Sequence, residues 1–402
     1  MNKALKWIGG IVGGLAALLV VIVLVLGVLP VAEDVPPKPL PSEIGAPTTA
    51  PTVRPVESGR TITVNAGDSI QAAIDEAKPG DTIEVMPGTY HESLTVTAHN
   101  ITLRGLPDAA GAWPILDGES AMDNGAFVIG SFFTIEQFQI RNYTENGVIT
   151  QGTYGPVYRD LVVDNPGEYA VFPIASTNVL IERVKATGAT DSALYVGQSR
   201  DVVVRDSEAY LSVTGIEIEN SVNALVENNY VHDNTAGILV FLLPNKNAKE
   251  GHNTTVINNR VENNNTPNFA TDGIVQDVPP GIGILVLIAD GTEVTGNTIS
   301  GNNSVGVGVV AATIFFDDVS DFDIPLIPEQ TWLHDNTYSK NGAKPADFLV
   351  KAGLPGVDVL WDASGWDNRF DDQGVKGFPI LPSSAWPDVL KKAVWRALQA
   401  LK

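Results

Sequence analysis

The sequence contains no cysteine among its 402 residues, which excludes disulfides, thiolate metal sites and a cysteine nucleophile. Basic residues are also scarce, since 25 Lys and Arg against 47 Asp and Glu give a net charge of −22. Such an acidic chain lacks the basic surface that nucleic acids require, so no nucleic-acid partner is expected. By contrast, 38 Gly and 26 Pro are present, and this density of turn-forming residues predicts many short segments rather than a helical array.

One long apolar segment lies near the start of the chain, where residues 7–29 contain no charged side chain and follow Lys3 and Lys6. A helix of this length, at about 1.5 Å per residue, crosses a bilayer. The sequence predicts an uncleaved transmembrane anchor over residues 1–30, with a cleaved signal peptide as the alternative. The basic flank predicts a single pass through the inner (cytoplasmic) membrane, with the remainder in the periplasm or outside the cell. Residues 31–59, with seven prolines, predict a semi-rigid linker.

A repeat of 22 or 23 residues follows the linker. Short apolar runs, each led by a small residue, recur at this interval, and one interval of 46 is either two periods or a single coil with long insertions. The runs begin at Gly147, Ala170, Ala193, Gly215, Gly237, Gly283 and Gly306. Asparagine pairs five residues apart mark the same repeat: Asn229 and Asn234, Asn259 and Asn264, Asn297 and Asn302, and Asn336 and Asn341.

This periodicity predicts a solenoid of short parallel strands. Asn suits the turns because it tolerates left-handed backbone, so stacked coils are expected to align these residues into ladders. Leucine-rich repeats have a similar period but need a leucine framework, which is missing here. We predict an all-β fold, a right-handed parallel β-helix over residues 81–345, with insertions near residues 242–252, 265–280 and 311–331.

Helices are predicted at both ends of the solenoid. Residues 60–80 form an N-terminal strand and a capping helix, with Asp68 or Ser69 as its N-cap, and this helix would cover the open end of the core. The C-terminal segment, residues 346–402, contains an apolar stripe at helical spacing after Ser384. The stripe predicts an amphipathic helix that braces the solenoid or, as the alternative, lies on the membrane.

Two stretches of the sequence resemble a known family. Residues 69–90, SIQAAIDEAKPGDTIEVMPGTY, resemble the first segment of exported bacterial parallel β-helix repeat proteins, in the superfamily that also holds pectate lyases and alginate epimerases. Residues 258–270, NNRVENNNTPNFA, resemble a repeat-containing subgroup of these proteins. The resemblance covers roughly residues 60–345; it implies the fold and, for function, points to carbohydrate.

The catalytic motifs of polysaccharide enzymes in this superfamily are missing, which favours a protein that is not an enzyme. Of the galacturonan-hydrolase motifs only the Asp-Asp pair is matched, with Asp317 and Asp318 as the candidate, and the alginate-epimerase Asp-Pro-His-Asp element is absent. Two His-Asp-Asn triplets, at His232 and His334, fall at different repeat positions and cannot form one site. Between residues 206 and 330, three basic residues accompany seventeen acidic ones, so an anionic glycan would be repelled unless Ca²⁺ intervened.

The first strand of each coil carries the candidate binding residues at its outward positions. These residues are Phe172, Tyr195, Glu217, Glu219, Leu239, Phe241 and Leu285. Most outward positions are apolar, and a bare strip of this size would exceed what soluble proteins expose. Either the insertions pack over the strip, or strip and insertions form a groove for a sugar or an apolar ligand. Glu217 and Glu219 have the spacing of a glycosidase pair, with ordinary surface acids as the alternative.

An acidic cluster is the candidate metal site, because closely spaced carboxylates can chelate Ca²⁺. Its members are Asp317, Asp318, Asp321 and Asp323. No other cofactor is demanded. The sequence thus predicts a membrane-anchored, exported β-helix that binds a ligand, above all carbohydrate, along its flank. One alternative is a polysaccharide-modifying enzyme, either a lyase, an epimerase or a hydrolase. The other is a structural or scaffold protein that docks a protein partner or a hydrophobic ligand on the strip.

Overall fold

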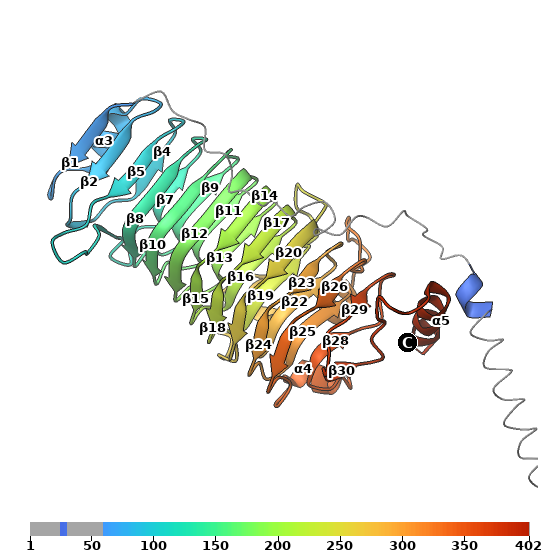
Figure 1. Cartoon of the computed structure of the whole chain (residues 1–402). Coiled ribbons are helices and arrows are strands. Elements are labelled where there is room, and N and C mark those ends of the chain that lie inside the picture. Colours follow the sequence, from blue (N-terminus) through green and yellow to red (C-terminus); the bar gives the residue numbers. More distant parts are fainter. Residues whose placement is uncertain (1–24, 30–58, 402) are drawn as a thin grey trace, which may run out of the picture.

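The computed structural model describes residues 25–29 and 59–401 (Figure 1). From residue 59 onward the chain forms a long stack of coils and advances from one end of the stack to the other. The predicted linker and most of the predicted anchor lie outside the described residues. Among the residues that are described, no helix is long and apolar enough to cross a membrane.

One flank of the stack is an 11-stranded parallel sheet. Its strands are β4 (Leu94–Val96), β7 (Asn124–Val128), β9 (Asn146–Gln151), β11 (Tyr169–Ile174), β13 (Ser192–Gly197), β16 (Thr214–Glu219), β19 (Ala236–Phe241), β22 (Ile282–Leu287), β25 (Val305–Val310), β28 (Val357–Trp361) and β30 (Gly377–Phe378). The register confirms the alignment of the repeat, since Val171, Leu194, Ile216 and Ile238 are partners in successive strands. Strand β19 pairs directly with β22, so the interval of 46 residues is one coil with long insertions.

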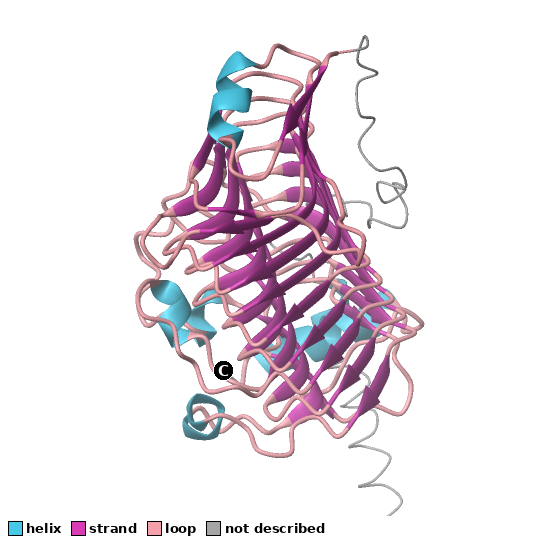
Figure 2. Ribbon diagram, turned by 90° about the vertical axis from the view of Figure 1, so that its left-hand side faces the viewer, coloured by secondary structure: helices cyan, strands magenta, loops and turns pink. Residues whose placement is uncertain are grey.

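The other strands form a 19-stranded parallel sheet (Figure 2). They are β1 (Thr61–Val64), β2 (Thr82–Val85), β3 (Thr89–Tyr90), β5 (Thr102–Gly105), β6 (Ile115–Asp117), β8 (Thr134–Arg141), β10 (Val157–Asp164), β12 (Thr177–Thr187), β14 (Arg200–Arg205), β15 (Glu208–Tyr210), β17 (Val222–Glu227), β18 (Tyr230–His232), β20 (His252–Ile257), β21 (Arg260–Glu262), β23 (Glu293–Thr295), β24 (Thr298–Ser300), β26 (Trp332–His334), β27 (Thr337–Ser339) and β29 (Arg369–Phe370). The sheet contains two rows of strands, which join where the long strands β8, β10 and β12 pair with both rows.

An aliphatic core fills the space between the sheets. Ile216 and Ile238 point inward from the 11-stranded sheet and are fully buried, as are Val226 and Val231 of the 19-stranded sheet. Burying an aliphatic side chain of this size stabilises the fold by about 1.5–3 kcal/mol. Because side chains alternate along a strand, the residues between these positions face outward and remain available for function.

Two asparagine ladders run through the turns of the coils, as predicted. In one, the Asn229 side-chain nitrogen donates to Asn259 Oδ1 at 3.0 Å, and Asn259 donates in the same way to Asn297 at 3.0 Å. The second ladder repeats this pattern from Asn234 through Asn264, Asn302 and Asn341. A buried amide without a partner costs about 1–3 kcal/mol, so each rung fixes the register of its coil.

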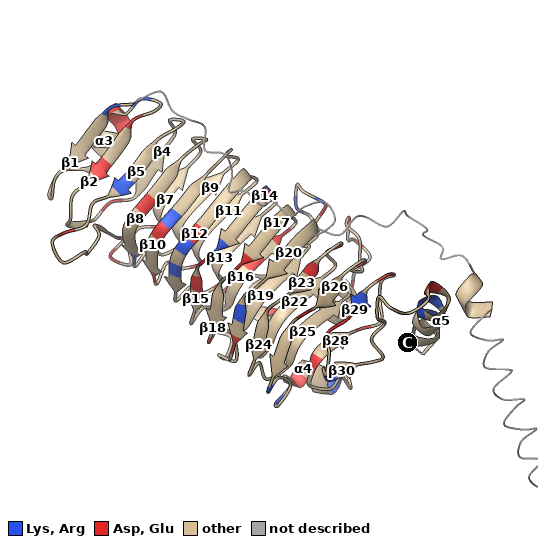
Figure 3. Ribbon diagram, in the orientation of Figure 1, with Lys and Arg blue, Asp and Glu red and all other residues tan. Residues whose placement is uncertain are grey.

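Opposite charges alternate along the outer face of the 19-stranded sheet (Figure 3). Successive strands place in register Glu84, Arg104, Glu136, Arg159, Glu182, Arg205 and Glu227. Within this charge ladder, Glu182 accepts from Arg159 Nε at 2.5 Å and from Arg205 Nη2 at 2.7 Å. The Glu182 carboxylate is therefore neutralised by arginines from the strands on both sides.

Helix α3 (Ile70–Glu76) covers the N-terminal end of the core, as predicted, and buries Ile70 and Ile74. Of the two candidate caps, Ser69 is the one that accepts from the helix, through its hydroxyl and the Ala72 amide at 3.1 Å. The carboxylate of Glu92 also accepts from the Ile70 and Gln71 amides at 2.8 and 2.9 Å. These bonds satisfy amide groups that a helix N-terminus leaves without partners.

The stack continues beyond the predicted boundary at residue 345. Strand β28 pairs with β25 and β30 pairs with β28, so part of the expected C-terminal segment belongs to the solenoid. The boundary was missed because a long insertion with helix α4 (Asp347–Lys351) interrupts the repeat before β28.

The terminal helix α5 (Asp388–Gln399) packs against this end of the solenoid. Its Trp395 ring meets Trp366 edge-on at 5.7 Å, and its Lys391 Nζ lies 3.7 Å from Asp367 Oδ1. Ala393 is 3% exposed. These contacts are those of the expected brace.

Candidate functional site

The outward strip of the 11-stranded sheet is largely covered by the insertions of the protein itself. Leu239, Phe241 and Leu285 are only 3%, 8% and 6% exposed. Val278 from one insertion and Phe316 from another pack against the same apolar cluster. The insertions contain the short 3-10 helices η1 (Ile274–Asp277) and η2 (Ala312–Ile314). Internal packing, one of the two predicted alternatives, thus accounts for most of the cover.

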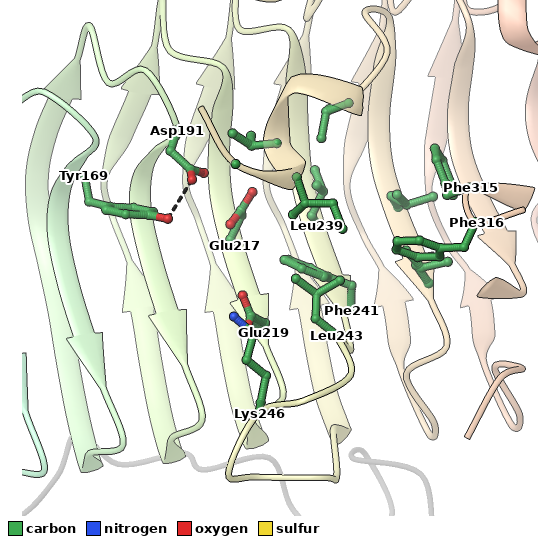
Figure 4. A pocket seen from close by; sticks show the side chains of 16 residues that line it. Tyr169, Asp191, Glu217, Glu219, Leu239, Phe241, Leu243, Lys246, Phe315 and Phe316 are labelled. Atoms are coloured by element: carbon green, nitrogen blue, oxygen red, sulfur yellow. Dashed lines mark hydrogen bonds and ion pairs between the residues drawn. The ribbon is translucent and has the colours of Figure 1, made fainter. Parts of the chain in front are cut away.

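A cavity of about 270 Å³ remains between the strip and the insertions (Figure 4). Strands β11, β16, β19 and β22 supply its floor, and the insertions supply its sides. The lining residues are Tyr169, Asp191, Glu217, Glu219, Leu239, Phe241, Leu243, Lys246, Gly273, Ile274, Val275, Val278, Leu285, Leu287, Phe315 and Phe316. The insertions therefore leave this part of the strip hollow, and the predicted binding of a ligand there stays a prediction.

Acidic side chains gather on one side of the cavity (Figure 4). Strand β16 presents Glu217 and Glu219 on the same face, because side chains two apart on a strand point the same way. Asp191 comes from the turn before β13, and the hydroxyl of Tyr169 donates to its Oδ2 at 2.6 Å. The Thr214 hydroxyl donates to Glu217 Oε1 at 2.8 Å. Three carboxyl groups from two neighbouring coils thus line the same cavity.

Glu217 is the most strongly perturbed of these acids. Its side chain is almost fully buried, at 4% exposed. Burial, and then the nearby charge of Asp191, raises the pKa of the Glu217 carboxyl well above its usual range. Within the described residues, Thr214 is the only hydrogen-bond partner of this carboxyl. Burial beside a second acid therefore favours the neutral form of the Glu217 carboxyl.

The pKa of Asp191 is shifted in the same direction as that of Glu217. Burial raises the pKa of Asp191 to about 6, although the hydrogen bond from Tyr169 opposes the shift. Two neighbouring carboxyls therefore both have raised pKa values. Perturbed acids of this kind are typical of sites that transfer protons.

The third acid is already paired. Lys246 Nζ lies 3.1 Å from Glu219 Oε1, and the Tyr195 hydroxyl donates to Oε2 at 2.9 Å. Asn220 holds the insertion that carries Lys246, because its side-chain nitrogen donates to the carbonyl oxygens of Leu243 and Ala248 at 3.0 and 2.8 Å. The charge of Glu219 is thereby balanced in a fixed geometry.

Five of the seven predicted binding residues line the cavity, namely Glu217, Glu219, Leu239, Phe241 and Leu285. Phe172 and Tyr195 do not line the cavity. The Tyr169 ring stacks on Phe172 at 4.4 Å between ring centres and meets Tyr195 at 5.1 Å. The two predicted aromatic residues therefore support Tyr169 rather than the cavity surface.

The sequence prediction of the site did not include Tyr169, Asp191 or Lys246. Asp191 has the same parity as Tyr195 and the other outward positions, so extending the alternation two residues upstream of Ala193 would have found it. Tyr169 falls at an inward position by alternation, yet its ring stacks on outward Phe172, so no pattern in the strand indicates it. Lys246 comes from an insertion, which has no repeat to align.

The structure does not bring the predicted metal ligands together. Asp318 accepts from the Ser320 amide at 2.9 Å, and Asp323 accepts from the Asn245 amide at 3.0 Å and pairs with Lys249. These carboxylates thus stabilise the turns and contacts of the insertions. Across residues 25–29 and 59–401, no three acidic or histidine side chains are grouped closely enough to hold a metal ion.

The two His-Asp-Asn triplets lie apart, as expected. His232 belongs to β18 and His334 to β26, strands of different rows in the 19-stranded sheet. Each ring is held between two carboxylates, with His334 Nε2 2.9 Å from Glu293 and Nδ1 2.7 Å from Asp335. Both histidines are occupied by local pairs and lie outside the cavity.

The architecture defines the class of protein. Residues 124–266 match the protein family described as right handed beta helix region. The chain therefore has the right-handed parallel β-helix fold that the sequence predicts.

Solved structures with this fold are similar to most of the chain. An alginate lyase from Paenibacillus sp. str. FPU-7 is 16% identical, with a TM-score of 0.52 over 69% of this chain and 95% of that one. The A-module of the mannuronan C-5 epimerase AlgE4 from Azotobacter vinelandii is also 16% identical, with a TM-score of 0.50 over 82% and 88%. At such identity the likeness concerns the fold. No curated protein matches the sequence significantly.

Proposed function

We propose that this chain is a polysaccharide-modifying enzyme in which Glu217 and Asp191 form an acid–base pair. The observation that carries the proposal is that buried Glu217 and half-buried Asp191 line one cavity, without an arginine among its lining residues. Structural ion pairs would lower their pKa values, whereas here both are raised. A group with a pKa near the working pH is the most effective proton carrier, and Asp191 at about 6 meets this condition.

The shape and chemistry of the cavity support a sugar. A pyranose ring has hydroxyls at its edge and an apolar face of C–H groups, so it needs a polar wall beside an apolar one. The cavity offers Asp191 and Glu217 on one side, and Leu239 and Phe241 on the other (Figure 4). The similar solved structures, an alginate lyase and a mannuronan epimerase, add that this fold carries polysaccharide chemistry.

In the proposed reaction, Glu217 donates its proton to the oxygen of the leaving group. Asp191 accepts a proton, either from a water molecule that attacks the sugar or from a carbon of the ring. Tyr169 orients Asp191 through its hydroxyl, and Thr214 orients Glu217. Lys246 balances Glu219 and so removes a further negative charge from the neighbourhood of the pair.

The test is incubation of the purified chain with a panel of neutral and uronate polysaccharides. New reducing ends would report hydrolysis, absorbance of unsaturated ends would report elimination, and NMR would report epimerisation. Glu217→Gln is the matched inactive control, since it keeps the shape of the side chain. Binding without any product would support the carbohydrate-binding function instead, and neither binding nor turnover would reject the proposal.

We further propose that the enzyme acts outside the cytoplasm, held at the membrane by residues 7–29. The support is the uncharged length of this segment and the prolines that follow it. The expected result is that the full chain sediments with membranes and that external protease digests the solenoid in spheroplasts. Recovery of the full chain in the soluble cytoplasmic fraction would contradict this location.

A further inference from the structure

We infer that the sugar bound in this cavity is uncharged and carries a short acyl group, such as an acetamido or an acetyl ester. The inference rests on the proposed function, because it names the substrate of the same site. It follows from two properties of the cavity, its balance of charges and the composition of its apolar side.

The charges of the cavity disfavour a uronate. Among the described residues that line it, Asp191, Glu217 and Glu219 are acidic and Lys246 alone is basic. Lys246 is already paired with Glu219 at 3.1 Å. A bound carboxylate would therefore meet Asp191 without a free cation, in a partly enclosed space where water screens charge poorly. An uncharged sugar avoids this repulsion.

The apolar side of the cavity requires more than hydroxyl groups. Ten of the sixteen lining residues are Leu, Ile, Val or Phe, and they come from strands and insertions alike. A sugar hydroxyl pressed against Phe241, Leu285 or Phe316 would lose its hydrogen bonds to water and gain none. A methyl group of an acyl substituent has no such bonds to lose, so it fits this side while the hydroxyls reach Asp191 and Glu217.

The volume agrees with one substituted ring of a longer glycan. At about 270 Å³, the cavity is slightly smaller than the roughly 300–1,000 Å³ of pockets that enclose whole drug-sized ligands. The absence of charge on the sugar also decides between the two reactions left open above, proton removal from a ring carbon and attack by water. Removing a proton from ring carbon requires an adjacent carboxyl group, which a neutral sugar lacks. Hydrolysis remains: water adds to the anomeric carbon, its proton passes to Asp191, and the glycosidic oxygen leaves with the proton of Glu217.

The experiment compares oligosaccharides that differ in one substituent. N-acetylated chitotetraose and cellotetraose are both neutral and differ only in the acetamido group that replaces the C2 hydroxyl of each ring. Acetylated xylotetraose and its de-esterified form test the acetyl ester. We expect the acylated member of at least one pair to bind about tenfold more tightly in calorimetry, the scale of discrimination by one small apolar group. Tetragalacturonate should bind more weakly than either acylated ligand. The preferred pair identifies the source of the acyl group.

Phe316→Ser tests the apolar side without altering a strand, and Phe316→Leu is its matched control. The serine variant should lose most of the preference for the acylated ligand, and the leucine variant should keep it. Equal affinities within both pairs, or tighter binding of tetragalacturonate, would overturn the inference. If Glu217→Gln still abolishes turnover in that case, the proposed function stands; if no glycan is bound or converted, the proposed function itself fails.

Discussion

The outer faces of the two sheets hold carboxylic acids in opposite states. On the 19-stranded sheet, burial tends to raise the pKa of Glu182, but hydrogen bonds and charges from Arg205 and Arg159 lower it overall. On the 11-stranded sheet, burial raises the pKa values of Asp191 and Glu217 without an arginine to oppose it. One face uses its acids to hold coils together, while the other keeps acids that destabilise the fold.

This difference separates acids that pair with neighbouring coils from the acids that we propose to be catalytic. A solenoid can extend its charge ladder to any coil, because each strand places its side chains in register with the next. The 11-stranded sheet departs from that solution at β16, where Glu217 and Glu219 lie in register with Leu239 and Phe241. Costly groups that persist in a cavity are typical of functional sites.

The largest expected effect is on catalysis. Glu217→Gln should lower kcat by about 10²–10⁴, the usual contribution of a general acid, while the free energy of unfolding stays the same or rises. Glu182→Gln on the other sheet should leave kcat unchanged. Turnover of the best substrate from the panel, measured beside urea unfolding for both variants, checks the contrast. Equal losses of activity in the two variants would show that neither face is specialised.

The next effect is on the pH dependence of stability. The pKa of Asp191 is raised in the folded protein, so its contribution is fully present below the unfolded pKa of about 4 and is lost as the pH rises through about 6. At pH 8 the free energy of unfolding of Asp191→Asn should therefore exceed that of the parent by up to about 3 kcal/mol. At pH 4 the two free energies should be similar. Urea unfolding at both pH values measures the difference. A variant that is less stable at pH 8 would contradict the shift.

The opposite sign is expected on the 19-stranded sheet. Because the pKa of Glu182 is lowered on folding, its contribution is present above the unfolded pKa and is lost as the pH falls through the folded value. Glu182→Gln should cost about 2 kcal/mol at pH 7, since Arg159 and Arg205 both lose a charged acceptor, and much less at pH 3. Urea titrations at the two pH values measure this, and a loss independent of pH would point to packing instead.

The fold could be predicted because each coil repeats the same local rules. Small residues such as Gly215 and Gly237 mark the register, and buried asparagines such as Asn229 need partners from the next coil, so sequence spacing translates directly into neighbours. The charge ladder follows the same rule, but its alternation of signs depends on the register of the strands and is not visible in the sequence. The end of the solenoid was placed too early because the insertion before β28 hides the last repeats.

The candidate site was predicted only in part, because it lies where the repeat breaks. Glu217 and Phe241 belong to strands and could be assigned an outward face from alternation. Whether that face is open depends on insertions such as the one that carries Phe316, and their conformation has no periodic signal. The raised pKa of Glu217 likewise arises from burial and from the charge of Asp191 on the preceding coil. Sequence spacing alone reveals neither of these.

The smallest effect on stability is expected from a partly solvent-exposed ion pair on the 19-stranded sheet. Lys185 Nζ is 2.9 Å from Glu208 Oε2, but the two side chains are 48% and 31% exposed. Water screens such a pair, so Lys185→Gln should change the free energy of unfolding by less than about 1 kcal/mol, and 1 M NaCl should remove even that difference. Urea unfolding at low and high salt tests this. A larger loss that persists in salt would contradict this, because an isolated exposed ion pair cannot supply it.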